Sequence, residues 1–199
     1  MIGHLKPDFK AVPPVDRAIT PTLKVGYLAH TVILKGLQYL LEAWEQLMIE
    51  TNYDDNLKLY IAGGIDESMH EYIVKHYLDI KNVQLIGRIA DVPSFMKDKD
   101  LFIVPSLVDG GPYTALEAAH YCLPVIITSN SGSGELLSRG DSGCHIIPIK
   151  DAASIKNEIY WAYHNRQEAK QLGLNAKRNL ENYKMEDFIS QLGDYLENV

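Results

Sequence analysis

The chain has 199 residues, of which 46% are hydrophobic and 23% charged, and its formal net charge is −7 at pH 7. These values are typical of a globular protein with one α/β domain and a substantial core. The negative balance, without any basic run, argues against a nucleic-acid-binding surface, and no apolar run approaches the roughly 18 residues that suggest a transmembrane helix.

The number of cysteines and the first residues of the chain indicate the cellular compartment in which the protein is expected. Cys122 and Cys144 are too few for a disulfide framework, and the histidines and cysteines show no metal-ligand spacing. The first ten residues lack the apolar stretch of a signal peptide. We therefore expect a cytoplasmic protein without a zinc site.

Along the chain, a proline-rich segment is followed by alternating strand and helix patterns. Residues 1–21 hold four of the nine prolines and are interpreted as a lead-in or linker, which leaves one domain at 22–199. Strands are predicted at 23–27, 57–62, 83–86, 101–104, 125–128 and 145–147. Helices are predicted at 37–48, 66–78, 92–97, 113–121, 151–164, 166–181 and 185–196.

This alternation indicates the fold class. Strands separated by single helices form parallel sheets with helices on both faces, so we expect a Rossmann-like α/β domain with a six-stranded parallel sheet. Ligands of such domains bind at the carboxyl ends of the strands. The loops after the strands are therefore where binding residues are expected.

The segment 104–128 holds the strongest candidate site. A strand ends here, and a Gly-Gly-Pro turn at 110–112 leads directly into a helix. The glycines allow the backbone to approach a ligand, and the amides at the positive end of the helix predict an anion site. Glu117, about one and a half turns into the helix, is placed to accept hydrogen bonds from adjacent hydroxyls, as on a ribose. The alternative is a plain loop-to-helix turn with an exposed glutamate.

The same segment resembles the C-terminal domain of retaining GT-B-fold glycosyltransferases, in the large group 1 (family 4) that includes sucrose and mannosyl transferases. Asp109 and Glu117 have the eight-residue interval of that family's two acids, and Ala118 follows. Further pieces resemble the rest of the domain in the same order: VGYLAHTVILKGLQYLLEAW, LKLYIAGG, VQLIGRI, KDLFIVPS and LPVIITSNSGSGELLSRGDSGCHIIPIKD. The resemblance runs from Leu23 to Asp151, and the expected fold is therefore the C-terminal half of a GT-B enzyme.

The resemblance implies roles for the matching residues. Lys35 is implied to neutralise the diphosphate of a nucleotide-sugar donor, Glu117 to hold the ribose, and Asp109 to contact the transferred sugar. The glycine turn at 63–64 is implied to line the cleft, and the loop at 87–88 to flank the nucleobase largely through backbone contacts. The implied substrate-binding residues are Gly63, Gly64, Gly87, Arg88, Ser106, Gly110, Gly111, Pro112, Tyr113 and Thr114.

The sequence departs from the family pattern mainly in its cations. Tyr27 stands where arginine is usual, and Leu34 stands where some relatives carry arginine, so Lys35 is the one clear phosphate cation. Asp109 is one methylene shorter than the usual glutamate. His30 lies in the loop after the first strand. It either helps to bind the diphosphate or is a solvated residue without a functional role.

The function implied by the resemblance is transfer of a hexosyl unit from a nucleotide diphosphate sugar to an acceptor, with retention of configuration and without a metal. The family's N-terminal acceptor domain has no counterpart in the chain. We therefore expect little or no activity from the chain alone. If the enzyme contacts a membrane surface, we expect that contact to lie in the absent half. Two alternatives are a non-catalytic nucleotide-sugar-binding module and a GT-B-fold sugar-nucleotide epimerase. The base, the sugar and the acceptor are not identified by the sequence.

Overall fold

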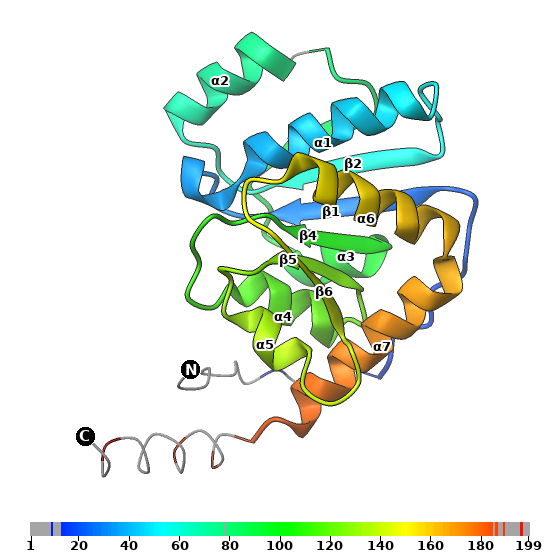
Figure 1. Ribbon diagram of the computed structural model, residues 1–199, viewed down its shortest axis with the longest axis vertical. Helices are drawn as coiled ribbons and strands as arrows, with labels where there is room; N and C mark the ends of the chain where they lie inside the picture. The colour runs from blue at the N-terminus through cyan, green and yellow to red at the C-terminus, as the bar shows by residue number, and fades with distance from the viewer. Residues whose placement is uncertain are drawn as a thin grey trace.

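The computed structural model describes residue 9 and residues 13–77, 79–184, 186, 189 and 196. Its centre is a parallel six-stranded sheet in the order β3-β2-β1-β4-β5-β6 (Figure 1). The strands are β1 (Leu23–Leu28), β2 (Leu57–Ala62), β3 (Val83–Gly87), β4 (Leu101–Val104), β5 (Val125–Thr128) and β6 (Cys144–Ile147). This is the Rossmann-like α/β fold that the sequence predicts.

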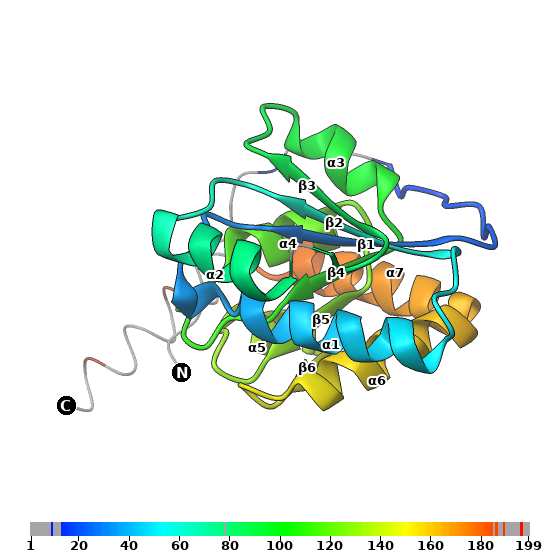
Figure 2. The ribbon, with the colours of Figure 1, turned by 90° about the horizontal axis from the view of Figure 1, so that it is seen from above.

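Helices cover both faces of the sheet. They are a 3-10 turn η1 (Ile33–Lys35), α1 (Leu37–Glu50), α2 (Glu67–Tyr77), α3 (Val92–Asp98), α4 (Tyr113–His120), α5 (Ser133–Leu137), α6 (Ala152–His164) and α7 (Arg166–Asn182). Figure 2 shows α1 and α6 on one side of the sheet and α3 on the other. The helices α4, α5 and α7 pack together on the α3 side.

Two apolar cores result, one on each face. Alternation along β4 divides its side chains, so that Leu101 and Ile103 join the core under α1 and α6, while Phe102 and Val104 join the core under α4 and α7. All four are buried, as expected for a central parallel strand covered on both sides. The sheet is thereby fixed in the middle of the domain, and its strand ends are left for binding.

The predicted elements agree with the structure except at short segments. All six strands are present, with bounds that differ by at most one residue from the prediction. The turn η1 and the helix α5 are missing from the prediction, because three and five residues are too short to show an apolar period. The helix predicted at 185–196 lies mostly outside the described residues.

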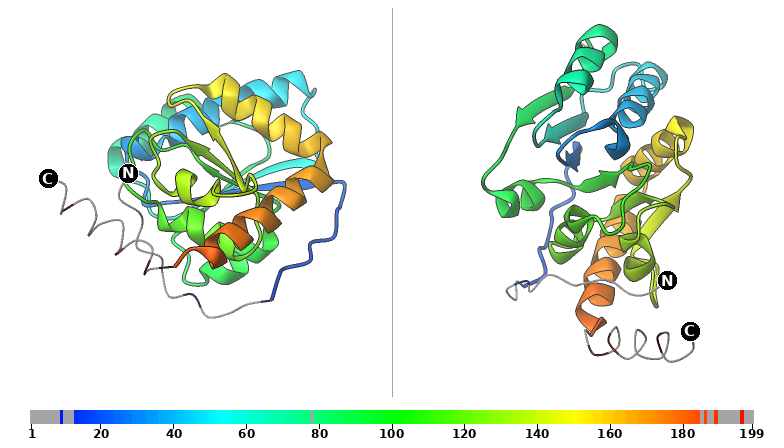
Figure 3. Two further views of the ribbon diagram at one scale, coloured as in Figure 1. Left: turned by 60° about the horizontal axis from the view of Figure 1, so that its bottom comes forward. Right: turned by 90° about the vertical axis from the view of Figure 1, so that its left-hand side faces the viewer.

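The described part of the lead-in, from residue 13 onward, has no helix or strand before β1 and runs along the outside of the domain (Figure 3). Arg17 attaches it by donating hydrogen bonds to the carbonyls of Met96, Lys99 and Tyr121, at distances of 3.0, 2.7 and 2.7 Å. These carbonyls lie at the carboxyl ends of α3 and α4, where backbone acceptors lack helical partners. Burial lowers the pKa of the Arg17 guanidinium.

Candidate functional site

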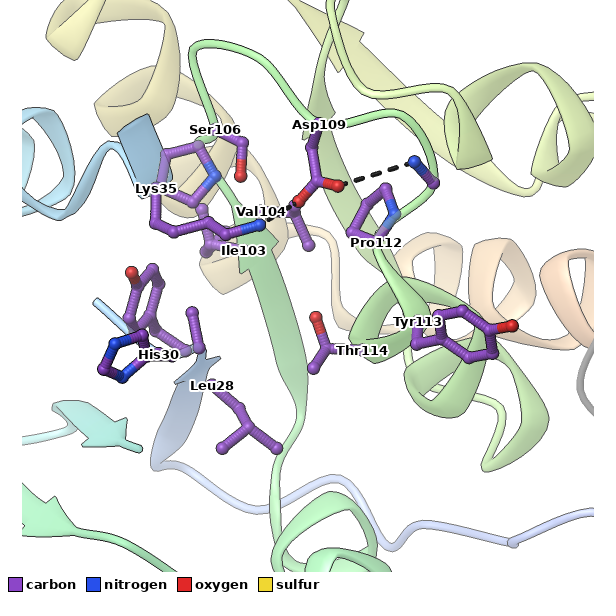
Figure 4. A pocket seen from close by; sticks show the side chains of 14 residues that line it. Leu28, His30, Lys35, Ile103, Val104, Ser106, Asp109, Pro112, Tyr113 and Thr114 are labelled. Atoms are coloured by element: carbon purple, nitrogen blue, oxygen red, sulfur yellow. Dashed lines mark hydrogen bonds and ion pairs between the residues drawn. The ribbon is translucent and has the colours of Figure 1, made fainter. Parts of the chain in front are cut away.

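A pocket of about 320 Å³ opens at the carboxyl ends of β1 and β4 (Figure 4). These strands are neighbours in the sheet, and the chain winds outward from them in opposite directions, towards β3 and towards β6. Such a switch point is where open α/β sheets bind ligands, and the volume is in the range of small-molecule sites. The lining residues are Tyr27, Leu28, Ala29, His30, Lys35, Ile103, Val104, Pro105, Ser106, Asp109, Gly111, Pro112, Tyr113 and Thr114.

The pocket brings together about half of the residues predicted for the site. Lys35, Ser106, Asp109 and the segment 111–114 line it. The predicted residues that do not line it are Gly63, Gly64, Gly87, Arg88, Gly110 and Glu117. They lie in the loops after β2 and β3, in the turn before α4, and one turn inside α4. The expected site is therefore wider than this pocket.

Backbone hydrogen bonds join the loops that follow β1, β2 and β3. Thr31 N donates to Gly64 O at 2.7 Å, and Asp66 N donates back to Thr31 O at 2.9 Å. Gly63 N donates to Gly87 O at 2.8 Å. Because each loop is held by its neighbour, side chains from three strands have defined positions at one edge of the sheet.

A second set of bonds joins the loops after β1, β4 and β5. Leu107 N donates to Leu34 O at 2.8 Å, Asp109 N to Asn130 O at 3.1 Å, and Gly132 N to Asp109 O at 3.0 Å. Sequence reasoning missed this contribution of the β5 loop. The only signal for it is the polar run after a buried strand, in which Asn130 also donates its side-chain amide to Leu107 O.

The loop that carries Lys35 is pressed against the end of β4. Gly36, which follows Lys35, has φ +71°, and a Cβ built on it would lie 1.9 Å from the carbonyl oxygen of Pro105. Real side chains do not make contacts this short, so a glycine is required here on both conformational and steric grounds. Gly36 thereby fixes how closely Lys35 approaches the loop of Asp109.

Lys35 and Asp109 form an ion pair across the pocket, with Nζ 2.6 Å from Oδ2 (Figure 4). The Asp109 side chain is only 13% exposed and that of Lys35 is 31% exposed. The resemblance assigns the two residues to different parts of a ligand, and the structure places them in contact with each other. The predicted phosphate cation is thus largely neutralised in this state.

Tyr27, which stands where the family has arginine, is a buried residue with 2% exposure. Its hydroxyl lies 3.2 Å from Thr31 Oγ1, and burial raises the pKa of the phenol well above its ordinary value. Tyr27 therefore contributes no charge to the pocket that it lines. His30, from the loop that follows β1, is exposed and lines the pocket.

The start of α4 presents unused backbone donors to the pocket. Pro112 is the N-cap residue, one position earlier than the first-turn placement expected from the sequence. Within the part of the chain that the structure describes, the amides of Tyr113 and Thr114 have no hydrogen-bond acceptor. These are the free donors that a helix start offers to an anion.

Glu117 is half-buried in α4, so the alternative of an exposed glutamate is wrong. Its carboxylate forms no hydrogen bond or ion pair with any described residue. Burial raises its pKa above the ordinary value of 4.5. A carboxylate that is desolvated without a protein partner is an available acceptor for ligand hydroxyls.

Replacing Glu117 by glutamine is expected to stabilise the free domain at neutral pH. Because the folded-state pKa is raised, the native state binds the proton more tightly, and stability falls as pH rises from the ordinary pKa through the folded one. Glutamine removes this loss. Thermal unfolding should give equal Tm values near pH 4 and a higher Tm for Glu117→Gln at pH 7. The exposed Glu71 of α2 supplies the control Glu71→Gln, and a Tm difference independent of pH would contradict the expectation.

Neither a metal centre nor a membrane span is found in the described residues. They contain no group of three His, Cys, Asp or Glu side chains arranged to hold a metal ion. None of the helices described there is long and apolar enough to cross a bilayer. Among the lining residues of the pocket, Lys35 and Asp109 carry charged side chains, and Tyr113 and Thr114 stand at the helix start.

Comparison with known proteins decides the family. Residues 15–179 match the family model of the glycosyl transferases group 1. The chain belongs to this family. Among curated group 1 relatives, the capsular polysaccharide biosynthesis glycosyltransferase CapM of Staphylococcus aureus is 26% identical over 164 residues, which are 79% of this chain and 41% of CapM. The chain thus spans less than half the length of this relative.

Solved structures share the fold. Anabaena Alr3699/HepE in complex with UDP has a TM-score of 0.72 at 18% identity, covering 90% of this chain and 50% of that chain. The C-terminal domain of the group 1 family protein LpcC from Francisella tularensis has a TM-score of 0.67 at 18% identity, covering 80% and 84%. The architecture is therefore that of the C-terminal domains of GT-B group 1 glycosyltransferases.

Proposed function

We propose that this chain is the donor-binding domain of a retaining glycosyltransferase, which transfers a hexosyl unit from a nucleotide diphosphate sugar to an acceptor. The observation that carries the proposal is the convergence of Lys35, Asp109 and the free amides of α4 in one pocket at the switch point. Membership of the group 1 family and the UDP complex of the HepE neighbour support it.

The proposed mechanism uses electrostatic stabilisation of the leaving group. Cleavage at the anomeric carbon leaves a diphosphate, and its negative charge is taken up by Lys35 and by the amides of Tyr113 and Thr114. Asp109 orients the transferred sugar by accepting hydrogen bonds from the hydroxyls of that sugar, and Glu117 accepts hydrogen bonds from the ribose hydroxyls. In binding, donor hydroxyls replace Lys35 as the partner of Asp109, and the lysine turns to the phosphates.

The proposed enzyme is independent of metal and divided between two domains. No metal or other cofactor takes part, so transfer is insensitive to EDTA. The acceptor site lies on an N-terminal domain outside this chain, and the chain alone does not complete transfer. Residues 1–21 act as the linker to that domain and 22–199 as the donor domain, in a cytoplasmic enzyme.

A thermal-shift screen of the chain with UDP-glucose, UDP-galactose, UDP-N-acetylglucosamine and GDP-mannose tests the binding step. At a concentration about 100 times Kd, a ligand specific for the native state stabilises it by about 2.7 kcal/mol, which raises Tm by several degrees in a domain of this size. We expect such a rise with at least one donor and none with the free sugars. No shift with any nucleotide sugar, at concentrations up to several millimolar, would count against the proposal.

A further inference from the structure

The side chains of Arg88 and His30, from the loops after β3 and β1, lie beside the pocket at Gly64. A Cβ built on Gly64 would lie 3.0 Å from Arg88 Nε, 3.6 Å from Arg88 Nη2 and 3.2 Å from His30 Nδ1. The guanidinium of the β3 loop and the imidazole of the β1 loop therefore border one point. A side chain at position 64 would require both neighbours to shift by a few tenths of an ångström.

Arg88 differs from the other arginines in having no hydrogen-bond or ion-pair partner among the described residues. Arg17 donates to three carbonyls, Arg166 and Arg178 lie near Asp100 and Asp141, and Arg139 lies near Glu135. Arg88 forms no hydrogen bond or ion pair with the described residues, although it is placed beside a pocket rather than on a remote surface. His30 likewise has no hydrogen-bond partner among them, and it lines the pocket.

The position of this pair follows from the joined loops. Gly63 N donates to Gly87 O, which attaches the residue before Gly64 to the residue before Arg88. Thr31 N donates to Gly64 O, which attaches the residue after His30 to the same point. The backbone segments that carry Arg88 and His30 are therefore fixed relative to each other by short hydrogen bonds, with both side chains reaching Gly64.

The charges that line the pocket leave a need for a second cation if a diphosphate is to bind there. Lys35 is paired with Asp109 at 2.6 Å, and the buried phenol of Tyr27 adds no charge beneath it. A diphosphate carries more than one negative charge, and a single, already paired lysine leaves it poorly compensated. A guanidinium matches phosphate oxygens with two parallel donors, and it keeps its charge at every physiological pH.

We propose that Arg88, assisted by His30, is a second cationic contact for the diphosphate of the donor, reaching it from the β3 side of the pocket while Lys35 reaches it from the β4 side. This inference rests on the proposed donor-binding function. It gives the Arg88 side chain a phosphate contact, beyond the backbone contact to the nucleobase that the family resemblance implies. Arg88 and His30 are binding residues in this assignment, since both touch the ligand.

Binding of inorganic pyrophosphate, UDP and uridine to wild type and Arg88→Gln tests the assignment, with GDP and guanosine in place of the uridine compounds if GDP binds more tightly. Loss of one charge-assisted contact weakens binding by about tenfold or more. We expect that loss for pyrophosphate and for the nucleoside diphosphate, and little change for the nucleoside, in calorimetric or NMR titrations. Arg88→Lys should recover part of the affinity, because lysine keeps the positive charge but lacks the two parallel N–H donors of the guanidinium.

Arg178→Gln is the matched control, since it removes the same charge from an exposed position on α7, and its nucleotide affinity should equal that of wild type. Gly64→Ala is an independent variant. Its Cβ displaces the ends of both flexible side chains, and Gly64 has no positive φ to strain the backbone. It should weaken pyrophosphate and UDP binding selectively, by less than Arg88→Gln does.

Equal losses for uridine and UDP would assign Arg88 to the base and overturn the inference, and so would unchanged pyrophosphate affinity in both Arg88→Gln and Gly64→Ala. Lys35→Ala and Glu117→Ala separate this outcome from failure of the proposed function. If those two variants weaken UDP binding while Arg88→Gln does not, only the second cationic contact is wrong. If none of the variants changes binding, the donor site itself is wrong.

Discussion

Lys35→Ala is expected to reduce transfer by about 10²–10³-fold in the full-length enzyme, and to weaken nucleoside diphosphate binding by about tenfold or more in this chain. The first figure is typical for removing one group that stabilises developing charge in a transition state, and the second for a lost charge-assisted contact. Titration calorimetry with UDP and GDP, followed by transfer assays on the full-length enzyme, measures both.

The same substitution has a structural cost that must be separated from its effect on binding. Without Lys35, the nearly buried carboxylate of Asp109 loses its ion-pair partner and keeps only a 3.4 Å hydrogen bond from Gly111 N, at a cost of about 1–3 kcal/mol in stability. Adding Asp109→Asn should restore much of that stability without restoring nucleotide binding. Lys24→Ala is a close control, because Lys24 makes a 2.6 Å pair with Asp98 and is similarly exposed, at 36%. Equal nucleotide affinities of Lys35→Ala and Lys24→Ala would refute the role of Lys35.

Gly36→Ala is expected to have a large effect on stability, a loss of about 3 kcal/mol or more in the free energy of unfolding. A left-handed residue other than glycine costs about 1–2 kcal/mol, and the clash of the added Cβ with the Pro105 carbonyl adds to it. The midpoint of urea unfolding measures the loss.

Two other glycines separate the contributions to this loss. Gly87 has φ +77° but nothing within 4 Å of its added Cβ, so Gly87→Ala should show the conformational cost alone. Gly110 has neither a positive φ nor a neighbour within 4 Å, and Gly110→Ala should be close to neutral. If Gly36→Ala were no worse than Gly87→Ala, the contact between the β1 and β4 loops would not be the constraint that we infer.

The sequence predicts the sheet well because the strands are short, mostly apolar runs, most of them bounded by glycine, proline or polar residues. β2, β4 and β5 have the predicted bounds, and β1, β3 and β6 gain one residue. The helices with several turns show an apolar face, whereas η1 and α5 are too short to show one. Elements that owe their form to tertiary contacts are therefore the ones that are missed.

The candidate site is predictable in its residue types but not in its internal contacts. Lys35 and Asp109 are 74 residues apart, and nothing local to either indicates that they pair. The approach of the Arg88 and His30 loops to Gly64 depends on backbone hydrogen bonds among three loops, which periodicity does not reveal. The burial of Tyr27 likewise follows from its place on the central strand β1, rather than from the loop chemistry around it.

The joined loops around the pocket determine when conformational entropy is lost. Amides such as those of Thr31, Gly63, Leu107 and Asp109 are already bound to neighbouring loops, so their segments are ordered as the domain folds. A ligand that binds to the start of α4 meets donors that are aligned in advance and has no loop to immobilise. More of its contact energy is then available as affinity, as in other preorganised sites.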